Sequence, residues 1–249
     1  MELLMMADAA RGASAASVTV VMPHYAYARS DKKDAPRISI GGRLVADLIH
    51  TAGANRVLTM ALHAQQVHGF FSMPVDHLSA LEVLAEHFRS RDLSKTVVVS
   101  PDFGNAKEAN QFARMLGVGM AAGSKRRQAD DKVVIDAIVG KVGGKDVIIL
   151  DDEIATAGSV VELIETVRRY HVNSISVACT HGLFSGKAVE RLNAVPDIVE
   201  IVTTDTVPPP VGLDRLSVVT VAPLFAEAMR RINCGESISG LFSDEVTYG

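Results

Sequence analysis

The chain has 249 residues, of which 48% are hydrophobic and 22% are charged, a balance typical of a folded globular protein rather than a disordered one. A formal net charge of −4 argues against nucleic acid as the main partner, and two cysteines do not make a disulfide framework. No apolar run is long enough to cross a bilayer. We therefore expect a cytoplasmic protein with no membrane partner, long enough for two modest domains.

The chain starts with a helical pattern over residues 1–10, in which Leu3, Met6 and Ala10 share one face. No capping residue precedes this helix, and it has neither the basic region nor the cleavage site of a signal peptide. Such an abrupt start is typical of a truncated chain or a misplaced start, although a natural start inside a core helix is an alternative.

Apolar runs and helical patterns then alternate, which predicts an α/β protein with a mostly parallel sheet. The segment 69–78 carries glycine, proline and aspartate and is the predicted boundary between a domain at 1–78 and another at 79–249. Strands are expected over 18–22, 57–60, 96–99, 147–150, 174–178, 198–203 and 218–221, and helices over 42–51, 80–90, 106–116, 159–170, 186–193 and 223–233.

The most informative segment follows the predicted strand 147–150. Two adjacent carboxylates, Asp151 and Asp152, stand where that strand should end, and a small-residue loop at 155–159 leads into a helical pattern. This order predicts a site for a phosphorylated sugar, because loop N–H groups can bind a phosphate at a helix N-terminus and carboxylates can accept hydrogen bonds from sugar hydroxyls. The alternative is an ordinary strand–helix turn in which Thr156 or Ser159 caps the helix.

Other polar residues follow predicted strands. The segment 123–131, with three consecutive cations, has the composition of a mobile loop that could close over phosphates, although a solvated charge run is the alternative. Asp102 follows the strand 96–99, at the edge where open α/β sheets bind ligands; an aspartate in a proline-containing turn is the other interpretation. His63 follows the strand 57–60, and a lone histidine is more often structural than a ligand.

The segment Asp151-Asp-x-x-x-Thr156-x-Gly158-Ser159 resembles the 5-phosphoribosyl diphosphate (PRPP) loop of type I phosphoribosyltransferases and ribose-phosphate diphosphokinases, although Glu153 and Ala155 depart from the usual residues. Further segments separate the two groups. Those at 23–34, 62–71, 100–104, 124–127, 178–182, 221–232 and 235–239 resemble successive parts of the ribose-phosphate diphosphokinase (PRPP synthetase) family, in the same order. The match begins late in the family pattern, after a stretch that includes an ATP-contacting loop.

The resemblance implies two phosphoribosyltransferase-like (type I) domains. The first is truncated at its N-terminus and lies on the ATP side, and the second lies on the ribose 5-phosphate side. The last helix of the chain is a candidate to pack on the first domain. It implies transfer of diphosphate from Mg-ATP to ribose 5-phosphate, giving PRPP and AMP for nucleotide biosynthesis. Mg²⁺ is the implied cofactor. A homo-oligomer, in which a neighbour completes the ATP site, is the implied assembly.

Site residues follow from the same resemblance, position by position. Lys125 is implied as the transition-state lysine and Arg127 as a contact to the sugar phosphate or ATP. The implied ATP-binding residues are Arg29, Ser30, Asp31, Asp34 and His63; the ribose 5-phosphate residues are Asp151, Asp152, Ala155, Thr156, Ala157, Gly158 and Ser159; the metal residues are His63 and Asp102. His181 and Gly182 are implied as residues at the edge of the site.

The sequence departs from the family at further positions in and near the ATP and metal residues. Ser30 stands for a glutamine, and Ala61 and Ser72 stand for acidic residues, although Asp76 remains. Water-mediated contact of His63 with the metal is therefore an alternative to direct ligation. The departures also leave open a non-catalytic regulatory or assembly homologue, and a PRPP-consuming phosphoribosyltransferase is a further alternative. Without the upstream ATP loop, we expect the 249-residue form to bind ribose 5-phosphate better than ATP and to be weak or inactive as a diphosphokinase.

Overall fold

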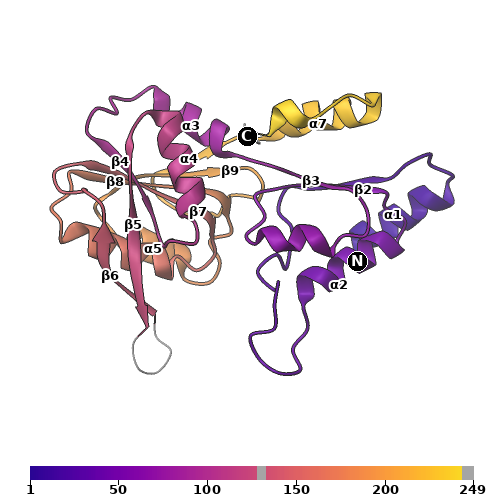
Figure 1. Ribbon diagram of the computed structural model, residues 1–249, viewed down its shortest axis with the longest axis horizontal. Coiled ribbons are helices and arrows are strands. Elements are labelled where there is room, and N and C mark those ends of the chain that lie inside the picture. Colours follow the sequence, from indigo (N-terminus) through magenta and orange to yellow (C-terminus); the bar gives the residue numbers. More distant parts are fainter. Residues whose placement is uncertain (128–132, 243–249) are drawn as a thin grey trace, which may run out of the picture. The chain divides into compact units, whose positions relative to one another are not determined.

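A computed structural model describes residues 1–127 and 133–242 of the chain; for residues 125–127, 133, 134 and 136 the description is limited to the backbone (Figure 1). The chain folds into two compact units, Met1–Ser79 and Ala80–Gly249. No helix in the described ranges is long and apolar enough to span a membrane.

Unit 1 is built on a three-stranded parallel sheet in the order β1-β2-β3. Its strands are β1 (Thr19–Met22), β2 (Arg56–Met60) and β3 (Val75–Leu78), and its helices are α1 (Glu2–Gly12), α2 (Gly41–Thr51) and the 3₁₀ helix η1 (Gln65–Phe70). The central strand β2 is the most deeply buried, with Val57, Leu58 and Met60 fully enclosed. Strand β3 lies in the segment predicted as a domain boundary. Its short sequence, with two polar residues between two apolar ones, lacks the continuous apolar run of a buried parallel strand.

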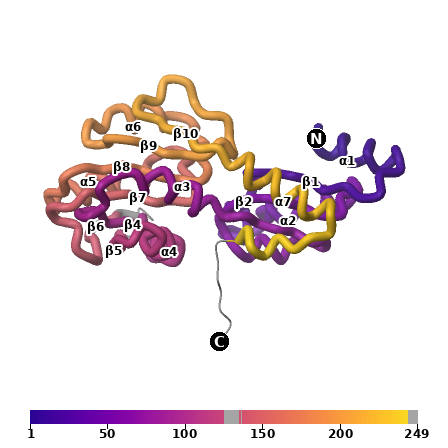
Figure 2. The backbone as a smooth tube through the Cα atoms, turned by 90° about the horizontal axis from the view of Figure 1, so that it is seen from above, coloured from indigo at the N-terminus to yellow at the C-terminus, as the bar shows by residue number. Residues whose placement is uncertain are grey.

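Unit 2 contains a seven-stranded sheet in the order β10-β9-β8-β7-β4-β5-β6, parallel except for β6. In Figure 2, β9 and β10 run along one side of this unit and β5 lies with α4 on the other. The strands are β4 (Thr96–Ser100), β5 (Gly119–Arg127), β6 (Val133–Val139), β7 (Asp146–Ile154), β8 (Ser174–Gly182), β9 (Ile198–Thr204) and β10 (Leu216–Val219).

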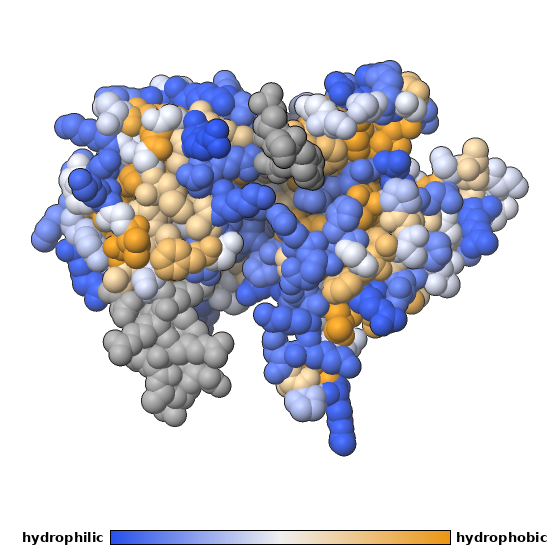
Figure 3. Space-filling view, in the orientation of Figure 1, coloured by the Kyte–Doolittle hydropathy of each residue, from blue (hydrophilic) through white to orange (hydrophobic). Residues whose placement is uncertain are grey.

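Helices cover both faces of the sheet in unit 2. The helices of this unit are α3 (Leu81–Arg89), α4 (Ala106–Leu116), α5 (Gly158–Arg168), α6 (Ala188–Asn193), α7 (Ala222–Cys234) and the 3₁₀ helix η2 (Ser239–Leu241). Alternate strand residues such as Val97 and Ile149 share one core with Leu163 of α5 and Leu192 of α6. Helices α3 and α4 pack against each other, and the ring centroids of Phe88 and Phe112 are 6.1 Å apart. The surface in Figure 3 mixes hydrophilic and hydrophobic residues, and Phe103 and Val139 are among the exposed large hydrophobic residues of this unit.

The structure corrects several sequence expectations. Strand β7 does not end at residue 150 but continues to Ile154, because its later residues keep pairing with β8, Asp151 with Cys179 and Glu153 with His181. The loop predicted from residue 123 is wrong for 123–127, which belong to β5 and pair antiparallel with β6; residues 128–131 lie outside the described ranges. Strand β10 begins two residues before its predicted start at 218.

Candidate active site

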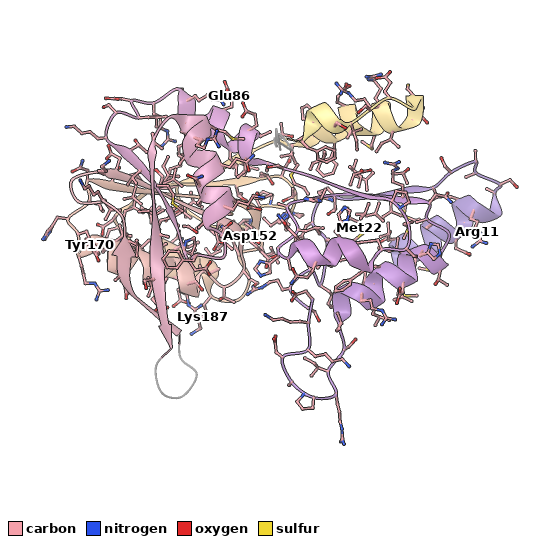
Figure 4. The ribbon with its side chains drawn as sticks, in the orientation of Figure 1. Arg11, Met22, Glu86, Asp152, Tyr170 and Lys187 are labelled. Carbon is pink, nitrogen blue, oxygen red and sulfur yellow. The ribbon has the colours of Figure 1, made fainter. Side chains whose placement is uncertain are left out.

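The paired carboxylates lie near the end of β7, where Asp152 is labelled in Figure 4. The backbone N–H of Asp152 donates a hydrogen bond to Asp151 Oδ1 at 3.0 Å. Burial raises the pKa of Asp151 well above its usual range, and the negative charges of Asp152 and Asp102 act in the same direction. Three carboxylates, two on β7 and one in the turn after the neighbouring strand β4, therefore make this edge of the sheet strongly acidic, an environment suited to hydroxyl groups or a cation.

A short loop of residues 155–157 follows β7 and leads into α5. Thr156, Gly158 and Ser159 are exposed, whereas Ala157 is buried and left-handed, with a φ of 59°. Ala157 is the N-cap residue of α5, and no side-chain hydrogen bond caps the helix. The alternative in which Thr156 or Ser159 caps α5 is therefore wrong. The first turn of α5 leaves backbone N–H groups available for an anion.

Asp102 lies in the turn after β4, and Asn105 connects this turn to β7. The N–H of Asn105 donates to Asp102 Oδ1 at 3.1 Å, and its Nδ2 donates to the carbonyl oxygen of Leu150 at 3.4 Å. The Ser100 hydroxyl donates to the carbonyl oxygen of Asp102 at 2.7 Å. The sequence interpretation missed Asn105. Its position directly before the predicted helix 106–116, where asparagine is a favoured N-cap residue, could have indicated it.

The segment of Lys125 and Arg127 is the end of β5. Ala122 is paired with Ser100 of β4, and a Cβ added at Gly123 would approach the carbonyl oxygen of Pro101 within 2.6 Å. This close approach brings the backbone of β5 against the residue before Asp102. The register then shifts at Ser124 and Lys125, and β5 continues beside β6 to Arg127. The side chains of Lys125 and Arg127 lie outside the described part.

His181 and Gly182, expected at the edge of the site, end β8. His181 is 2% exposed, and its Nδ1 lies 2.9 Å from the Thr206 hydroxyl, so it belongs to the interior. A Cβ at Gly182 would come within 2.3 Å of the Phe184 ring, so only glycine fits there. Burial raises the pKa of the nearby Cys179 thiol to about 12, which keeps it an unreactive thiol.

In unit 1, the predicted ATP-binding residues Arg29, Ser30, Asp31 and Asp34 lie in a loop between β1 and α2. Ser30 is held in place: its hydroxyl accepts the N–H of Gly41 at 2.9 Å. Asp31 accepts a hydrogen bond from Gln66, which joins this loop to the segment after β2 that carries the exposed His63. Arg29 is exposed, and so is Asp34, whose carboxylate lies 3.9 Å from the ammonium of Lys32.

The predicted metal residues come from both units of the chain. His63 belongs to unit 1 and Asp102 to unit 2, and the described residues contain no group of three or more His, Cys, Asp or Glu side chains able to hold a metal ion. Asp76, the acidic residue that remains where Ser72 departs from the family, is paired with Arg56 at 2.5 Å. Its carboxylate is therefore already neutralised by an arginine.

Comparison with known proteins decides the family. The family model of the N-terminal domain of ribose phosphate pyrophosphokinase matches residues 1–53, and that of the phosphoribosyl synthetase-associated domain matches residues 126–243. A ribose-phosphate pyrophosphokinase of Deinococcus radiodurans is 52% identical over 98% of this chain and 78% of its own length. The chain belongs to the ribose-phosphate pyrophosphokinase family. A Streptomyces coelicolor relative is 63% identical over 97% of this chain and 77% of its own length.

The fold agrees with this assignment. The crystal structure of phosphoribosylpyrophosphate synthetase from Mycobacterium smegmatis is similar to this chain, with a TM-score of 0.87 and 37% identity over 94% of this chain and 78% of that one. The family resemblance and the α/β class expected from the sequence are thus confirmed.

Proposed function

We propose that this chain transfers a diphosphate group from Mg-ATP to ribose 5-phosphate, producing PRPP and AMP. The observation that carries the proposal is the succession of acidic strand end, exposed small-residue loop and helix N-terminus from Asp151 to Ser159. The carboxylates of Asp151 and Asp152 would accept hydrogen bonds from ribose hydroxyls. The loop and the first turn of α5 would bind the 5-phosphate through backbone N–H groups.

Lys125 and Arg127 are proposed to act on the transferring group. Diphosphoryl transfer needs neutralisation of phosphate charge and close alignment of two substrates more than covalent chemistry. A lysine supplies a point charge, and an arginine can bind phosphate oxygens in a bidentate manner. The backbone of β5 passes Pro101, the residue before Asp102, at Gly123, two residues before Lys125, and this proximity supports a common role with the acidic residues.

Nucleotide binding is assigned to the unit 1 residues Arg29, Ser30, Asp31, Asp34 and His63. The hydrogen bond between Asp31 and Gln66 supports treating their two segments as one site, since it links the loop after β1 to the loop after β2. Both loops follow the carboxyl ends of parallel strands, which is where open α/β sheets bind ligands.

The carboxylates at the end of β4 and β7 fit a hard cation, since Mg²⁺ prefers oxygen ligands and usually keeps several waters. Asp102 would hold Mg²⁺ together with substrate phosphates, directly or through water, and His63 would assist on the nucleotide side. The bound ion would neutralise the charge on the phosphates. The fit with a substrate-shared ion is better than with a protein cage, because the described side chains offer no ready set of three ligands.

The proposal is tested by following AMP formation from ATP with and without ribose 5-phosphate. AMP release that requires the sugar phosphate supports the diphosphokinase. Two features favour a non-catalytic homologue. Ala61 stands where the family has an acidic residue, and the carboxylate of Asp76 is paired with Arg56. That alternative predicts binding of ribose 5-phosphate without AMP release.

We also propose that the active form is a cytoplasmic homo-oligomer.

A further inference from the structure

The carbonyl groups of Ile154, Ala155 and Thr156, at the end of β7 and in the loop after it, are bonded to one segment of the chain, residues 183–191. The carbonyl oxygen of Ile154 accepts the N–H groups of Leu183 at 3.0 Å and Phe184 at 3.1 Å. The carbonyl oxygen of Ala155 accepts the N–H of Ser185 at 2.8 Å and its hydroxyl at 3.3 Å.

The next carbonyl in the loop is held by an arginine side chain. Nη1 of Arg191, on α6, donates to the carbonyl oxygen of Thr156 at 2.8 Å. The same Nη1 would lie 3.7 Å from a Cβ built on Gly158. The guanidinium therefore lies beside both the Thr156 carbonyl and Gly158, the first residue of α5.

The bonding of these carbonyls fixes the direction of the N–H groups. In a trans peptide the N–H points opposite to the carbonyl of the preceding residue, and the described residues contain no cis peptide. With the carbonyls of residues 154–156 turned toward 183–191, the N–H groups of Ala155, Thr156 and Ala157 point to the other side. Together with the first turn of α5 they can face one anion.

Ala157 lies between the two groups that Arg191 approaches. It is a non-glycine residue in the left-handed region, with φ 59°, and its side chain is buried. Such a conformation is unfavourable for a residue with a Cβ and persists where neighbouring contacts enforce it. The bond from Arg191 to the carbonyl oxygen of Thr156 fixes the peptide that immediately precedes Ala157.

We propose that Arg191 is a positioning residue for the sugar-phosphate loop, holding Thr156 and Ala157 in the conformation that presents their N–H groups to the phosphate. This inference rests on the proposed function, because it assigns the loop to the 5-phosphate of the sugar substrate. Arg191 acts from behind the loop, through the backbone, and its positive charge beside Gly158 adds to the favourable potential at the N-terminus of α5.

Arg191→Met removes the donors while keeping an apolar side chain, and Arg191→Lys retains a charge without the planar fork. Arg215→Met is the matched control. Arg215 also uses Nη1 on backbone carbonyls of unit 2, Val195 at 3.2 Å and Ile198 at 2.6 Å, but not on the loop. Thermal unfolding identifies any variant that fails to fold, in which case Arg191→Lys provides the comparison.

The first measurement uses ligand-free protein. Amide resonances of Ala157, Gly158 and Ser159 should move in Arg191→Met and stay in place in Arg215→Met. The second is calorimetry with ribose 5-phosphate, in which Arg191→Met should bind about 10-fold more weakly, as expected for loss of a charge-assisted hydrogen bond. Ala157→Gly in the Arg191→Met background should recover part of this loss, since glycine adopts the left-handed conformation without a steric penalty.

The outcomes separate the two proposals. If the wild-type chain does not bind ribose 5-phosphate, the proposed function and the positioning role both fall. If the wild type binds it and Arg191→Met binds it equally well, only the positioning role is overturned. Weaker binding with unmoved ligand-free amides also overturns it, because Arg191 would then contact the phosphate directly. Weaker binding with moved amides, and an unchanged KM for ATP in turnover, supports the positioning role.

Discussion

Asp151 accepts a hydrogen bond from the backbone N–H of Asp152 at 3.0 Å, so these two adjacent residues of β7 are joined as well as mutually repelling. Consecutive strand residues normally point to opposite faces, and this bond keeps the Asp151 carboxylate beside the backbone of its neighbour. A charge pair of this kind costs stability in the free protein and is useful once hydroxyl groups or a cation arrive.

The first prediction concerns that cost. The pKa of Asp151 is raised in the folded state, mainly by burial. The stability of the protein therefore falls as the pH rises from the usual pKa of an aspartate through the raised pKa of Asp151. Asp151→Asn removes the buried charge, and we expect Tm at pH 8 to rise by roughly 2–4 °C. The gain should shrink toward pH 4, where the wild-type carboxyl is protonated. Calorimetric melts at both pH values measure this, and a variant that is less stable at pH 8 would contradict it.

The same pair should be required for the sugar. Asp151→Asn with Asp152→Asn is expected to weaken ribose 5-phosphate binding by ~10-fold or more, since two charged acceptors become neutral amides. The fold should remain intact, as judged by circular dichroism. Titration calorimetry measures the affinity. Asp146→Asn, at the opposite end of β7, is the matched control and should bind normally. Unchanged affinity in the double variant would remove the carboxylates from the site.

Lys125 is predicted to matter mainly for turnover. Lys125→Ala should reduce kcat by about 10²–10³-fold, because its charge is most useful where negative charge redistributes in the transition state. The KM values should change much less. Lys141→Ala, an exposed lysine in the connection between β6 and β7, serves as the control and should keep full activity. A Lys125→Ala variant with normal kcat and a raised KM would show that the residue only binds substrate.

Gly182 is predicted to be structurally irreplaceable. An added Cβ would meet the Phe184 ring at 2.3 Å and the Thr203 hydroxyl at 2.6 Å. Gly182→Ala should cost about 1–3 kcal/mol of unfolding free energy, as overpacking of a core does. Gly119→Ala in β5, where nothing lies within 4 Å of the new Cβ, should cost less. Denaturant unfolding compares the two, and equal stabilities would show that Phe184 can move aside freely.

Periodicity predicted the elements that carry their own signal. Helix α4 occupies 106–116 as expected, and β4 and β9 match within one residue, because their apolar residues recur at the spacing of a helix or cluster in a short strand. Strands β5 and β6 were not predicted, because neither has an alternating apolar pattern and both are defined by pairing, β5 with β4 and β6, and β6 with β5. Strand β7 extends beyond its apolar residues because β8 continues to pair with it.

The candidate site was only partly accessible to sequence reasoning. Asp151 to Ser159 stood out because strand, carboxylates, loop and helix are consecutive in the chain. Arg191 is 35 residues from the Thr156 carbonyl that it bonds, and the contact goes to backbone, which leaves no pattern in the sequence. The bond from Asn105 to the carbonyl of Leu150 was missed for the same reason, because it also goes to backbone and spans 45 residues of sequence.

Synthesis of PRPP by the chain is measured by ³¹P NMR of a mixture of chain, Mg²⁺, ATP and ribose 5-phosphate. Diphosphate transfer cleaves ATP between its α and β phosphates. We therefore expect AMP and PRPP in equal amounts, and neither product when ribose 5-phosphate is left out. ADP with free phosphate, or AMP formed at the same rate without the sugar phosphate, would contradict it.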